Sequence, residues 1–279
     1  FWLRASGSGL RVQIAHHQSP APSARRLAPE VFVVHATIFK ENALNRLMTT
    51  IRRSEERGQV DFGWLKSYHT FSFGDYRDEN WVHYRSLRVI NTDFVAPGAG
   101  FPTHPHRDME IVTYMLDGAL AHRDSMENGS TIRPGDVQRM TAGSGITHSE
   151  FNPSETEPAS LLQIWLFPTK KGLTPSYEQT TFDPAELQNA LRVVASPDGR
   201  EGSVSIHQNA LILASKLEVG RSVTHTHDAT RGLWLHVIEG EVTANSTTLQ
   251  PGDAAAFEEV GTLNIEASKD AHFLLFDLA

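Results

Sequence analysis

Four side chains in the first half of the chain have the types and the spacing of a metal site. His104 and His106 lie two residues apart in a segment rich in β-forming residues, and His148 and Glu150 repeat that spacing. Because alternate side chains of a strand point to the same face, each pair can present both of its side chains to one point. Three imidazoles and a carboxylate suit Fe(II), Mn, Ni, Cu or Zn, and around an octahedral ion they leave two positions open for substrate and O2. If the two strands face each other, the spacing predicts a catalytic metal site; the alternative is that each pair is an ordinary surface or hydrogen-bonded strand pair.

The composition limits how such a metal could be held and what the protein could bind. The 279 residues include no cysteine, which excludes disulfides, iron–sulfur clusters, thiolate zinc sites and a cysteine nucleophile, so a metal must be bound by histidine and carboxylate. The formal net charge of −8 argues against nucleic-acid binding through clustered lysine and arginine. No apolar run approaches the roughly 18 residues of a transmembrane helix, so we expect no membrane span. We expect a cytoplasmic monomer whose partner is a small molecule or a protein.

From Met48 onward the sequence has the pattern of short strands separated by turns. Turn signals such as PGAG at 97–100 and NGS at 128–130 lie between β-forming runs. Helical periodicity is nearly absent before residue 180, and the clearest helix start is Asp183 followed by Pro184. This pattern predicts an all-β fold, a β-barrel or jelly roll, with a short helical connector.

Two segments differ from this pattern. Residues 1–47 carry several arginines and serines and have no acidic residue among the first 29, a composition that a transit peptide can share. We favour the interpretation that this leader is not part of the fold, which would then begin at Met48. Residues 169–188 are polar and rich in turn-forming residues, and we expect them to form a linker or arm between two halves.

The second half of the chain repeats the order of motifs in the first. Residues 104–118 and 225–240 both begin with an HxH pair and end at a glycine, and the PGD at 134–136 recurs at 251–253. A repeat in this order indicates two barrels of one type that arose by duplication.

The second copy lacks part of the predicted metal site. The positions that correspond to the second pair fall near Ile265 and Ala267, whose side chains cannot bind a metal. We therefore expect no metal in the second barrel, where His225 and His227 would be relics or structural residues.

The sequence resembles the pirin family of the cupin superfamily from about Met48 to its end. The resemblance is carried by HTFSFGDY at 69–76, LRVINTD at 87–93, GFPTHPHRDMEIVTY at 100–114, GDVQRMTAGSGITHSE at 135–150, LQIWLFP at 162–168, PSYEQ at 175–179 and SPDG at 196–199. It implies two cupin-type β-barrels (double-stranded β-helices or jelly rolls) packed face to face. We therefore expect a metal-binding barrel at 48–168 and a barrel without metal at 189–279.

The resemblance also implies one metal per chain, usually iron, in the N-terminal barrel. Its ligands would be His104, His106, His148 and Glu150, the residues that the strand spacing selects. We expect Fe(2+), with Mn, Ni, Cu, Co or Zn as alternatives. One departure from the family pattern is Glu127, where the family usually has a glycine, and this change would alter a turn near the barrel mouth.

Other polar residues of the first half have simpler interpretations. Glu110 has the strand parity of the first histidine pair and could be a fifth ligand, but its counterpart in the family is not one. We expect it to have a hydrogen-bonding or core-polar role. The second copy has Arg231 at this position. His69, His83 and His122 could line the cavity mouth, although an ordinary exposed or hydrogen-bonded histidine is the simpler interpretation for each.

The function that the resemblance implies is 2,3-dioxygenation of a flavonol such as quercetin. The metal would act as a template and Lewis acid for a substrate hydroxylate and O2. Glu150 would also be catalytic, because as a weakly held ligand it could take the substrate hydroxyl proton and pass it on. The competing hypothesis is a non-enzymatic, iron- or redox-dependent regulatory protein that acts on a transcriptional or metabolic partner. A cavity that reaches the metal would favour the enzyme, whereas a large exposed patch near it would favour the regulator.

Overall fold

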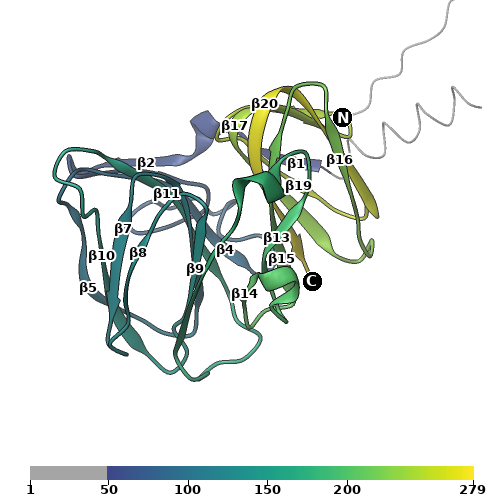
Figure 1. Ribbon diagram of the computed structural model, residues 1–279. Helices are drawn as coiled ribbons and strands as arrows, with labels where there is room; N and C mark the ends of the chain where they lie inside the picture. The colour runs from purple at the N-terminus through teal and green to yellow at the C-terminus, as the bar shows by residue number, and fades with distance from the viewer. Residues whose placement is uncertain (1–48) are drawn as a thin grey trace, which may run out of the picture. The chain divides into compact units, whose positions relative to one another are not determined.

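The computed structural model describes residues 49–279, and nearly all of their regular structure is β-strand (Figure 1). The strands form two barrels, as the duplicated motifs predict. The predicted leader, residues 1–47, lies outside the described residues.

The N-terminal barrel consists of a seven-stranded and a four-stranded antiparallel sheet. The larger sheet has the order β12-β9-β6-β11-β4-β3-β2 and the smaller one the order β5-β10-β7-β8. The strands of the larger sheet are β2 (Gly58–Asp61), β3 (Leu65–His69), β4 (Leu87–Val95), β6 (Glu110–Asp117), β9 (Asp136–Thr141), β11 (Ala159–Leu166) and β12 (Ser176–Thr181). Those of the smaller sheet are β5 (Gly100–His106), β7 (Leu120–Asp124), β8 (Gly129–Ile132) and β10 (Ile146–Phe151).

The C-terminal barrel is one nine-stranded sheet with the central order β1-β19-β17-β20-β15-β13-β14, to which β16 and β18 add at β20 and β17. Its strands are β1 (Thr49–Arg52), β13 (Arg192–Ser196), β14 (Val204–Ser205), β15 (Ala210–Leu217), β16 (Ser222–Thr226), β17 (Gly232–Ala244), β18 (Thr247–Leu249), β19 (Ala254–Phe257) and β20 (Thr262–Leu278). Only the β13–β14 pair is parallel.

The central strands of the larger N-terminal sheet are buried on both faces, and β11 shows how the sequence achieves this. Leu162 and Ile164 belong to an apolar cluster that also contains Trp234 and Phe276 of the C-terminal barrel. Gln163, between them, points the other way and lines the cavity of the N-terminal barrel. Because successive side chains alternate, one strand supplies both the contact between the barrels and the wall of the cavity.

The helical connector is shorter than the sequence predicts. Asp183 does cap a helix, since its side chain accepts a hydrogen bond from the Ala185 backbone, but η2 (Pro184–Leu187) is a single 3₁₀ turn. It ends because Asn189 adopts a left-handed φ of 53° and donates its backbone N–H to Lys216 O, which directs the chain into the C-terminal sheet. The other helices are also short 3₁₀ turns: η1 (Ser54–Glu56) and η3 (Arg200–Gly202).

Two strands pair differently from the predicted domain boundaries. β1 lies within the segment assigned to the N-terminal barrel, yet it pairs with β19 of the C-terminal sheet, with Thr49 opposite Phe257 (Figure 1). The predicted linker at 169–188 contains β12, which pairs with β9 along its whole length. Neither pairing could be read from the sequence, because both strands are short and polar.

The repeated motifs have the same conformation in both barrels. Asp136 and Asp253 each accept a hydrogen bond from the backbone N–H three residues earlier, which closes the Pro-Gly-Asp turn. Gly118 and Gly240 have φ values of 72° and 75°, and a Cβ on either would clash with a backbone carbonyl oxygen of a neighbouring strand. Both positions therefore require glycine for the same reason.

Candidate metal centre

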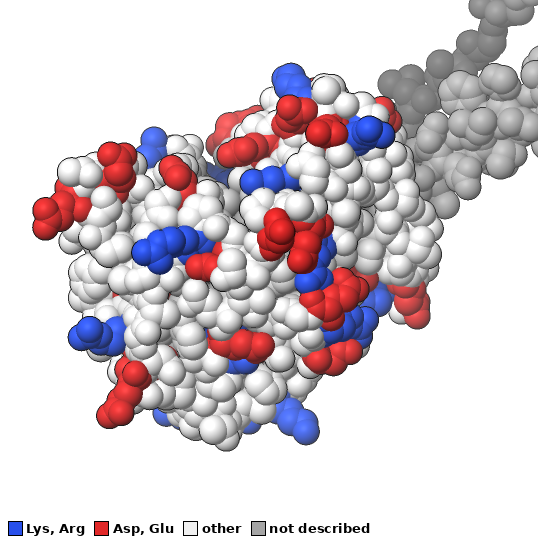
Figure 2. Space-filling view, viewed as in Figure 1, with Lys and Arg blue, Asp and Glu red and all other residues white. Residues whose placement is uncertain are grey.

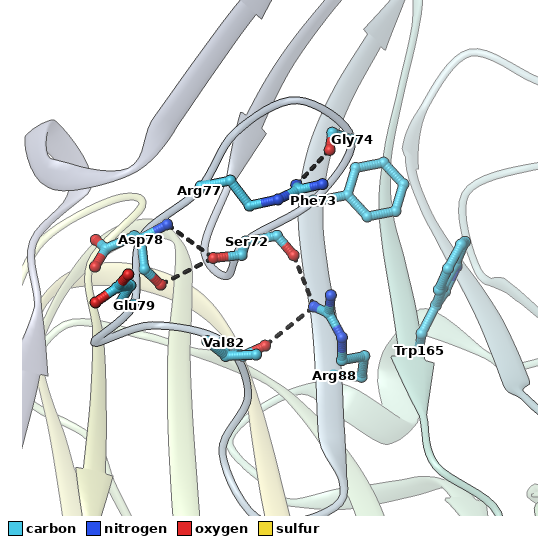
Figure 3. A pocket seen from close by; sticks show the side chains of 9 residues that line it. All are labelled: Ser72, Phe73, Gly74, Arg77, Asp78, Glu79, Val82, Arg88 and Trp165. Atoms are coloured by element: carbon cyan, nitrogen blue, oxygen red, sulfur yellow. Dashed lines mark hydrogen bonds between the residues drawn. The ribbon is translucent and has the colours of Figure 1, made fainter.

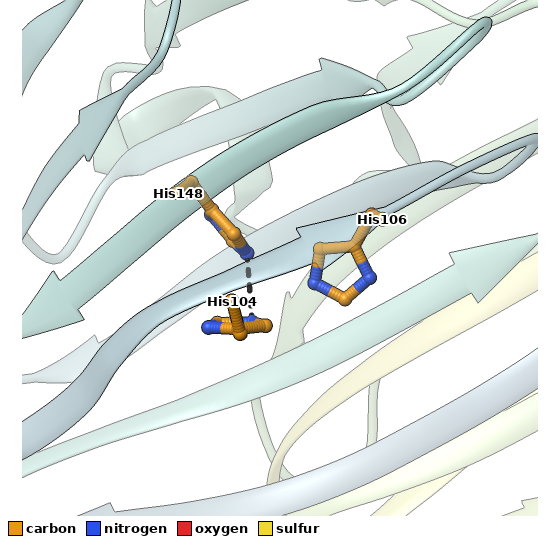
Figure 4. Close-up of side chains that lie close together, drawn as sticks. All are labelled: His104, His106 and His148. Carbon is orange, nitrogen blue, oxygen red and sulfur yellow. Dashed lines mark hydrogen bonds between the residues drawn. The ribbon is translucent and has the colours of Figure 1, made fainter.

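Three of the four predicted ligands converge at one end of the smaller N-terminal sheet. His104 on β5 lies directly opposite His148 on the neighbouring strand β10, and their Nε2 atoms are 3.0 Å apart. The ring of His106 is 4.7 Å from the first ring and 4.8 Å from the second, measured between centroids (Figure 4). One nitrogen of each ring lies within 4.8 Å of the others, so the three histidines could hold a metal ion.

The geometry and protonation of these rings fit a metal. Two nitrogens that are each about 2.1 Å from one ion, at right angles, are about 3.0 Å apart. His104 Nδ1 lies 2.8 Å from Pro102 O, which places the ring hydrogen there and leaves the Nε2 lone pair free. Burial, with the nearby imidazoles, lowers the pKa of His106 to about 4 and that of His148 to about 2. The rings of these two residues are therefore neutral at pH 7, as a ligand must be.

Glu150 lies beside this cluster, on the same face of β10 as His148. It has a carboxylate oxygen within 4.8 Å of ring nitrogens of His148 and His122. It is 2% exposed, and its Oε2 accepts a hydrogen bond from Gln163 Nε2 at 3.1 Å. Its Oε1 has no hydrogen-bond partner among the described residues. Burial, followed by the charge of Asp93, raises its pKa to about 7. Glu150 thus has a free, buried oxygen and can exchange a proton near neutrality.

His122, for which an exposed or hydrogen-bonded histidine is the simpler interpretation of the sequence, is buried, hydrogen-bonded and next to His148. It is 3% exposed, its Nδ1 lies 3.5 Å from His148 Nδ1, and its Nε2 lies 3.3 Å from Asp124 Oδ2. The Met126 and Asn128 backbone N–H groups hold that carboxylate in turn. The sequence did contain a hint that His122 is near the metal-binding histidines, because His122 and Asp124 repeat the i, i+2 spacing. The pairing of their strand, β7, with β10 is seen only in the structure.

Glu110 is not near the metal-binding rings. β5 ends at His106 and Glu110 begins β6 in the other sheet, so the strand parity does not carry across the turn between them. Glu110 is fully buried and its Oε2 accepts hydrogen bonds from Thr141 Oγ1 at 3.0 Å and the His207 backbone at 3.1 Å. The expected hydrogen-bonding role is confirmed, and it joins the two barrels.

A cavity of about 660 Å³ leads to the histidines. Its aromatic lining residues are Phe62, Trp64, Phe73, Tyr76, Phe101 and Trp165. Among the histidines expected near its mouth, His69 lines the cavity, whereas His83 is exposed and bonds Arg85 O.

A second pocket, open to the surface, lies on the other side of part of this wall (Figure 3). Phe73, Gly74 and Trp165 line both spaces. The rings of Phe73 and Trp165 meet edge to face, with centroids 5.2 Å apart. This aromatic pair borders both spaces, beside the loop between β3 and β4.

The corresponding place in the C-terminal barrel is occupied by an ion pair. His225 Nε2 lies 2.8 Å from Asp277 Oδ2, and the Arg231 side chain contacts the same carboxylate. Arg231 stands where the first repeat has Glu110. In the C-terminal barrel the Arg231 guanidinium therefore places a positive charge beside the Asp277 carboxylate.

Comparison with known proteins identifies the family. A family model described as Pirin matches residues 50–166, and one described as Quercetinase C-terminal cupin domain matches residues 193–278. The chain is 43% identical over 231 residues to a quercetin 2,3-dioxygenase of Escherichia coli K12, which covers 83% of this chain and 99% of that protein. The chain belongs to the pirin family.

Solved structures agree with this assignment. A crystal structure of the bacterial pirin YhhW from Escherichia coli in complex with nickel(II) is 43% identical, covers 83% of this chain and 99% of that one, and has a TM-score of 0.79. A quercetin 2,3-dioxygenase structure from Acinetobacter baumannii, at 24% identity, has a TM-score of 0.65 over 82% of this chain and 85% of that one, and supports the fold alone. Within residues 49–279, no helix has the length and apolar character needed to cross a bilayer.

Proposed function

We propose that this pirin-family chain is a metal-dependent dioxygenase that cleaves a flavonol such as quercetin at the 2,3 bond. The observation that carries the proposal is the convergence of three imidazoles, those of His104, His106 and His148, at the end of a cavity lined by aromatic rings. At about 660 Å³ the cavity lies in the range of about 300–1,000 Å³ that is usual for small-molecule sites. The E. coli relative at 43% identity is named for this activity.

The proposed ligands are His104, His106, His148 and Glu150, and we propose one divalent metal per chain. Fe(2+) is the proposed metal, because the reaction consumes O2; a nickel(II) complex of a relative supports the choice of a first-row transition metal. When bound, the metal would supply Lewis acidity and a template for substrate and O2.

Glu150 is the proposed proton carrier. Glu150 lines the cavity, its Oε1 has no hydrogen-bond partner among the described residues, and a pKa of about 7 lets the carboxylate accept a phenolic or enolic proton and release it again. Gln163 holds the other oxygen and so fixes the direction of the carboxylate. Phe73 and Trp165 would exclude bulk water from that side of the cavity.

The regulatory alternative has less support from the molecule. A deep cavity at the metal-binding rings is what an enzyme requires and what a surface switch does not need. On the face of the described residues drawn in Figure 2, Lys and Arg lie interspersed with Asp and Glu. That distribution does not favour direct binding of nucleic acid, in line with the net charge of −8.

The test is anaerobic loading with Fe(2+), and separately with Ni(2+), followed by measurement of O2 uptake with quercetin. We expect uptake by the wild type and a loss of at least tenfold in kcat for Glu150→Gln, which keeps the shape of the side chain. His225→Ala is the matched control and should keep full activity. Absence of O2 uptake with either metal at full occupancy would refute the proposed reaction.

A further inference from the structure

A further cavity, of about 440 Å³, lies between the two barrels. It is on the opposite face of the larger sheet from the metal centre. The alternation of side chains along β4 places the two spaces on opposite faces of the sheet, and Gln59, on its edge strand β2, lines both. Asn91 and Asp93 line the metal cavity, whereas Thr92 and Phe94 line the second one. Its other wall comes from β17, between His236 and Glu239, and from the turn at Pro251 and Gly252.

Arg57 gives this cavity a buried positive charge. The residue is 6% exposed, and its Nη2 donates to Tyr68 O at 2.6 Å and Thr92 Oγ1 at 2.9 Å, both neutral acceptors. Its Nε has no hydrogen-bond partner within residues 49–279. Asp93 attracts it only through space, and burial lowers its pKa to about 10. A buried arginine is normally paired, so among the described residues Arg57 lacks the anion that its position calls for.

A second buried polar group faces the same space. His236 is 1% exposed, and its Nδ1 has no hydrogen-bond partner in the part of the chain that the structure describes. The apolar residues that line the same cavity are Phe94, Leu116, Leu162, Ile238 and Pro251. Phe94 is 43% exposed, so its ring is accessible from solvent. A cavity with an apolar lining and a few convergent polar groups, at a junction between barrels, has the features of a ligand site.

Three exposed carboxylates, Glu55, Asp117 and Glu239, also line the cavity. Because they are exposed, solvent screens them from a single charge deep in the cavity. These three carboxylates would repel a ligand with several negative charges more strongly than a ligand with one. The lining therefore favours one negative charge on an apolar body over a phosphorylated compound.

We propose that the cavity between the barrels binds a small aromatic acid, whose carboxylate pairs with Arg57 and whose ring lies against Phe94 and Leu162. His236 adds a hydrogen bond to the same ligand. The site is separate from the metal centre, and the proposal does not depend on the reaction catalysed there.

The test uses two probes of one shape, 1-naphthoate and the neutral 1-naphthamide, titrated into the zinc-loaded chain and followed by amide NMR. We expect 1-naphthoate to shift the resonances of Arg57, Phe94 and residues 237–239, with a dissociation constant at least tenfold lower than that of 1-naphthamide. Arg57→Met should weaken 1-naphthoate at least tenfold. Arg88→Met is the matched control, since Arg88 also donates to backbone carbonyls but lies in the surface pocket of Figure 3.

Ser160→Phe provides a second variant in case Arg57→Met does not fold. It keeps the arginine and fills the cavity from β11, so it should also abolish the shifts at residues 237–239. Equal affinity for the two probes, shifts confined to the surroundings of His104, or full affinity in a folded Arg57→Met or Ser160→Phe variant would each overturn the proposal.

Discussion

His104 and His148 lie opposite each other on antiparallel strands with their Nε2 atoms 3.0 Å apart. This spacing is close to that of two nitrogens bound to one ion at right angles. In a metal-free protein two such lone pairs repel, unless one ring is protonated or a proton is shared. The backbone therefore brings together groups whose spacing suits a metal, and this relationship leads to the first prediction.

Replacing His104, His106 or His148 by Ala should remove most of the bound metal, because each variant loses one of three converging nitrogens. His225→Ala and His227→Ala should leave about one metal per chain. Metal analysis of the purified variants measures both. A full equivalent of metal in His148→Ala would show that the site lies elsewhere.

His122→Phe should lower metal affinity by about 10- to 100-fold, because His148 loses the buried ring that orients its Nδ1. Competition with a chelator measures the affinity. His83→Phe, at an exposed histidine, is the control and should be neutral. An unchanged affinity for His122→Phe would mean that the ring only fills space.

Asp93→Asn should stabilise the metal-free protein above pH 4. Burial is the main cause that raises the pKa of Asp93 from 3.8 to about 6, although a hydrogen bond from Ser67 and the charge of Arg57 oppose the shift. A raised carboxyl pKa means that the folded state binds the proton more tightly, so stability is lost as the pH rises from about 4 to about 6. The gain for the variant should therefore grow over this window to at most about 3 kcal/mol.

Urea unfolding of both proteins between pH 3.5 and pH 7 measures this difference. A difference that stays constant with pH would show that Asp93 does not titrate in this range.

Glu127→Gly should raise the thermal midpoint. Glu127 is exposed, lies in the β7–β8 turn and has a φ of 69°, a conformation that costs a residue with a Cβ about 1–2 kcal/mol. Part of that gain is offset by the greater freedom of glycine in the unfolded chain, which leaves about 1 kcal/mol. Glu127→Ala keeps the strain and serves as the control in calorimetry. Equal midpoints for the Gly and Ala variants would contradict this explanation.

The isolated segment 48–168 should be molten or poorly soluble even with metal. It contains all four proposed ligands, yet it loses β12 from its sheet edge and exposes Leu162 and Ile164, which pack with the C-terminal barrel. Amide dispersion by NMR measures the outcome. A well-dispersed, metal-loaded fragment would show that the N-terminal barrel folds without its partner.

The parts of the site that could be predicted from the sequence depend on the period of two in a strand. That period places His104 with His106 and His148 with Glu150, and it needs no knowledge of the rest of the fold. The same rule fails for Glu110, because β5 ends at His106 and a new strand begins at Glu110, so the alternation of side chains does not continue from one to the other. It also cannot show that His122 lies behind His148, since that contact depends on which strands are neighbours in the sheet.

The order of the repeated motifs was enough to predict two barrels, but not the pairing at their edges. The PGD turns recur because each aspartate closes its own turn, which is a local interaction. The partners of β1 and β12 are set by long-range pairing, which short polar segments do not encode locally.

The pairing of β1 with β19 has a consequence for synthesis of the chain. Thr49 and Phe257 are neighbours in the finished sheet but are separated by about two hundred residues in the sequence. At about 5–20 residues per second, a ribosome needs roughly 10–40 s to make that length. During this interval β1 has no partner strand. The metal-binding barrel that follows β1 is made within the same interval and is complete before β19 is. Joining of β1 to the sheet is therefore among the last steps of assembly, and a nascent chain that stops before residue 254 cannot complete it.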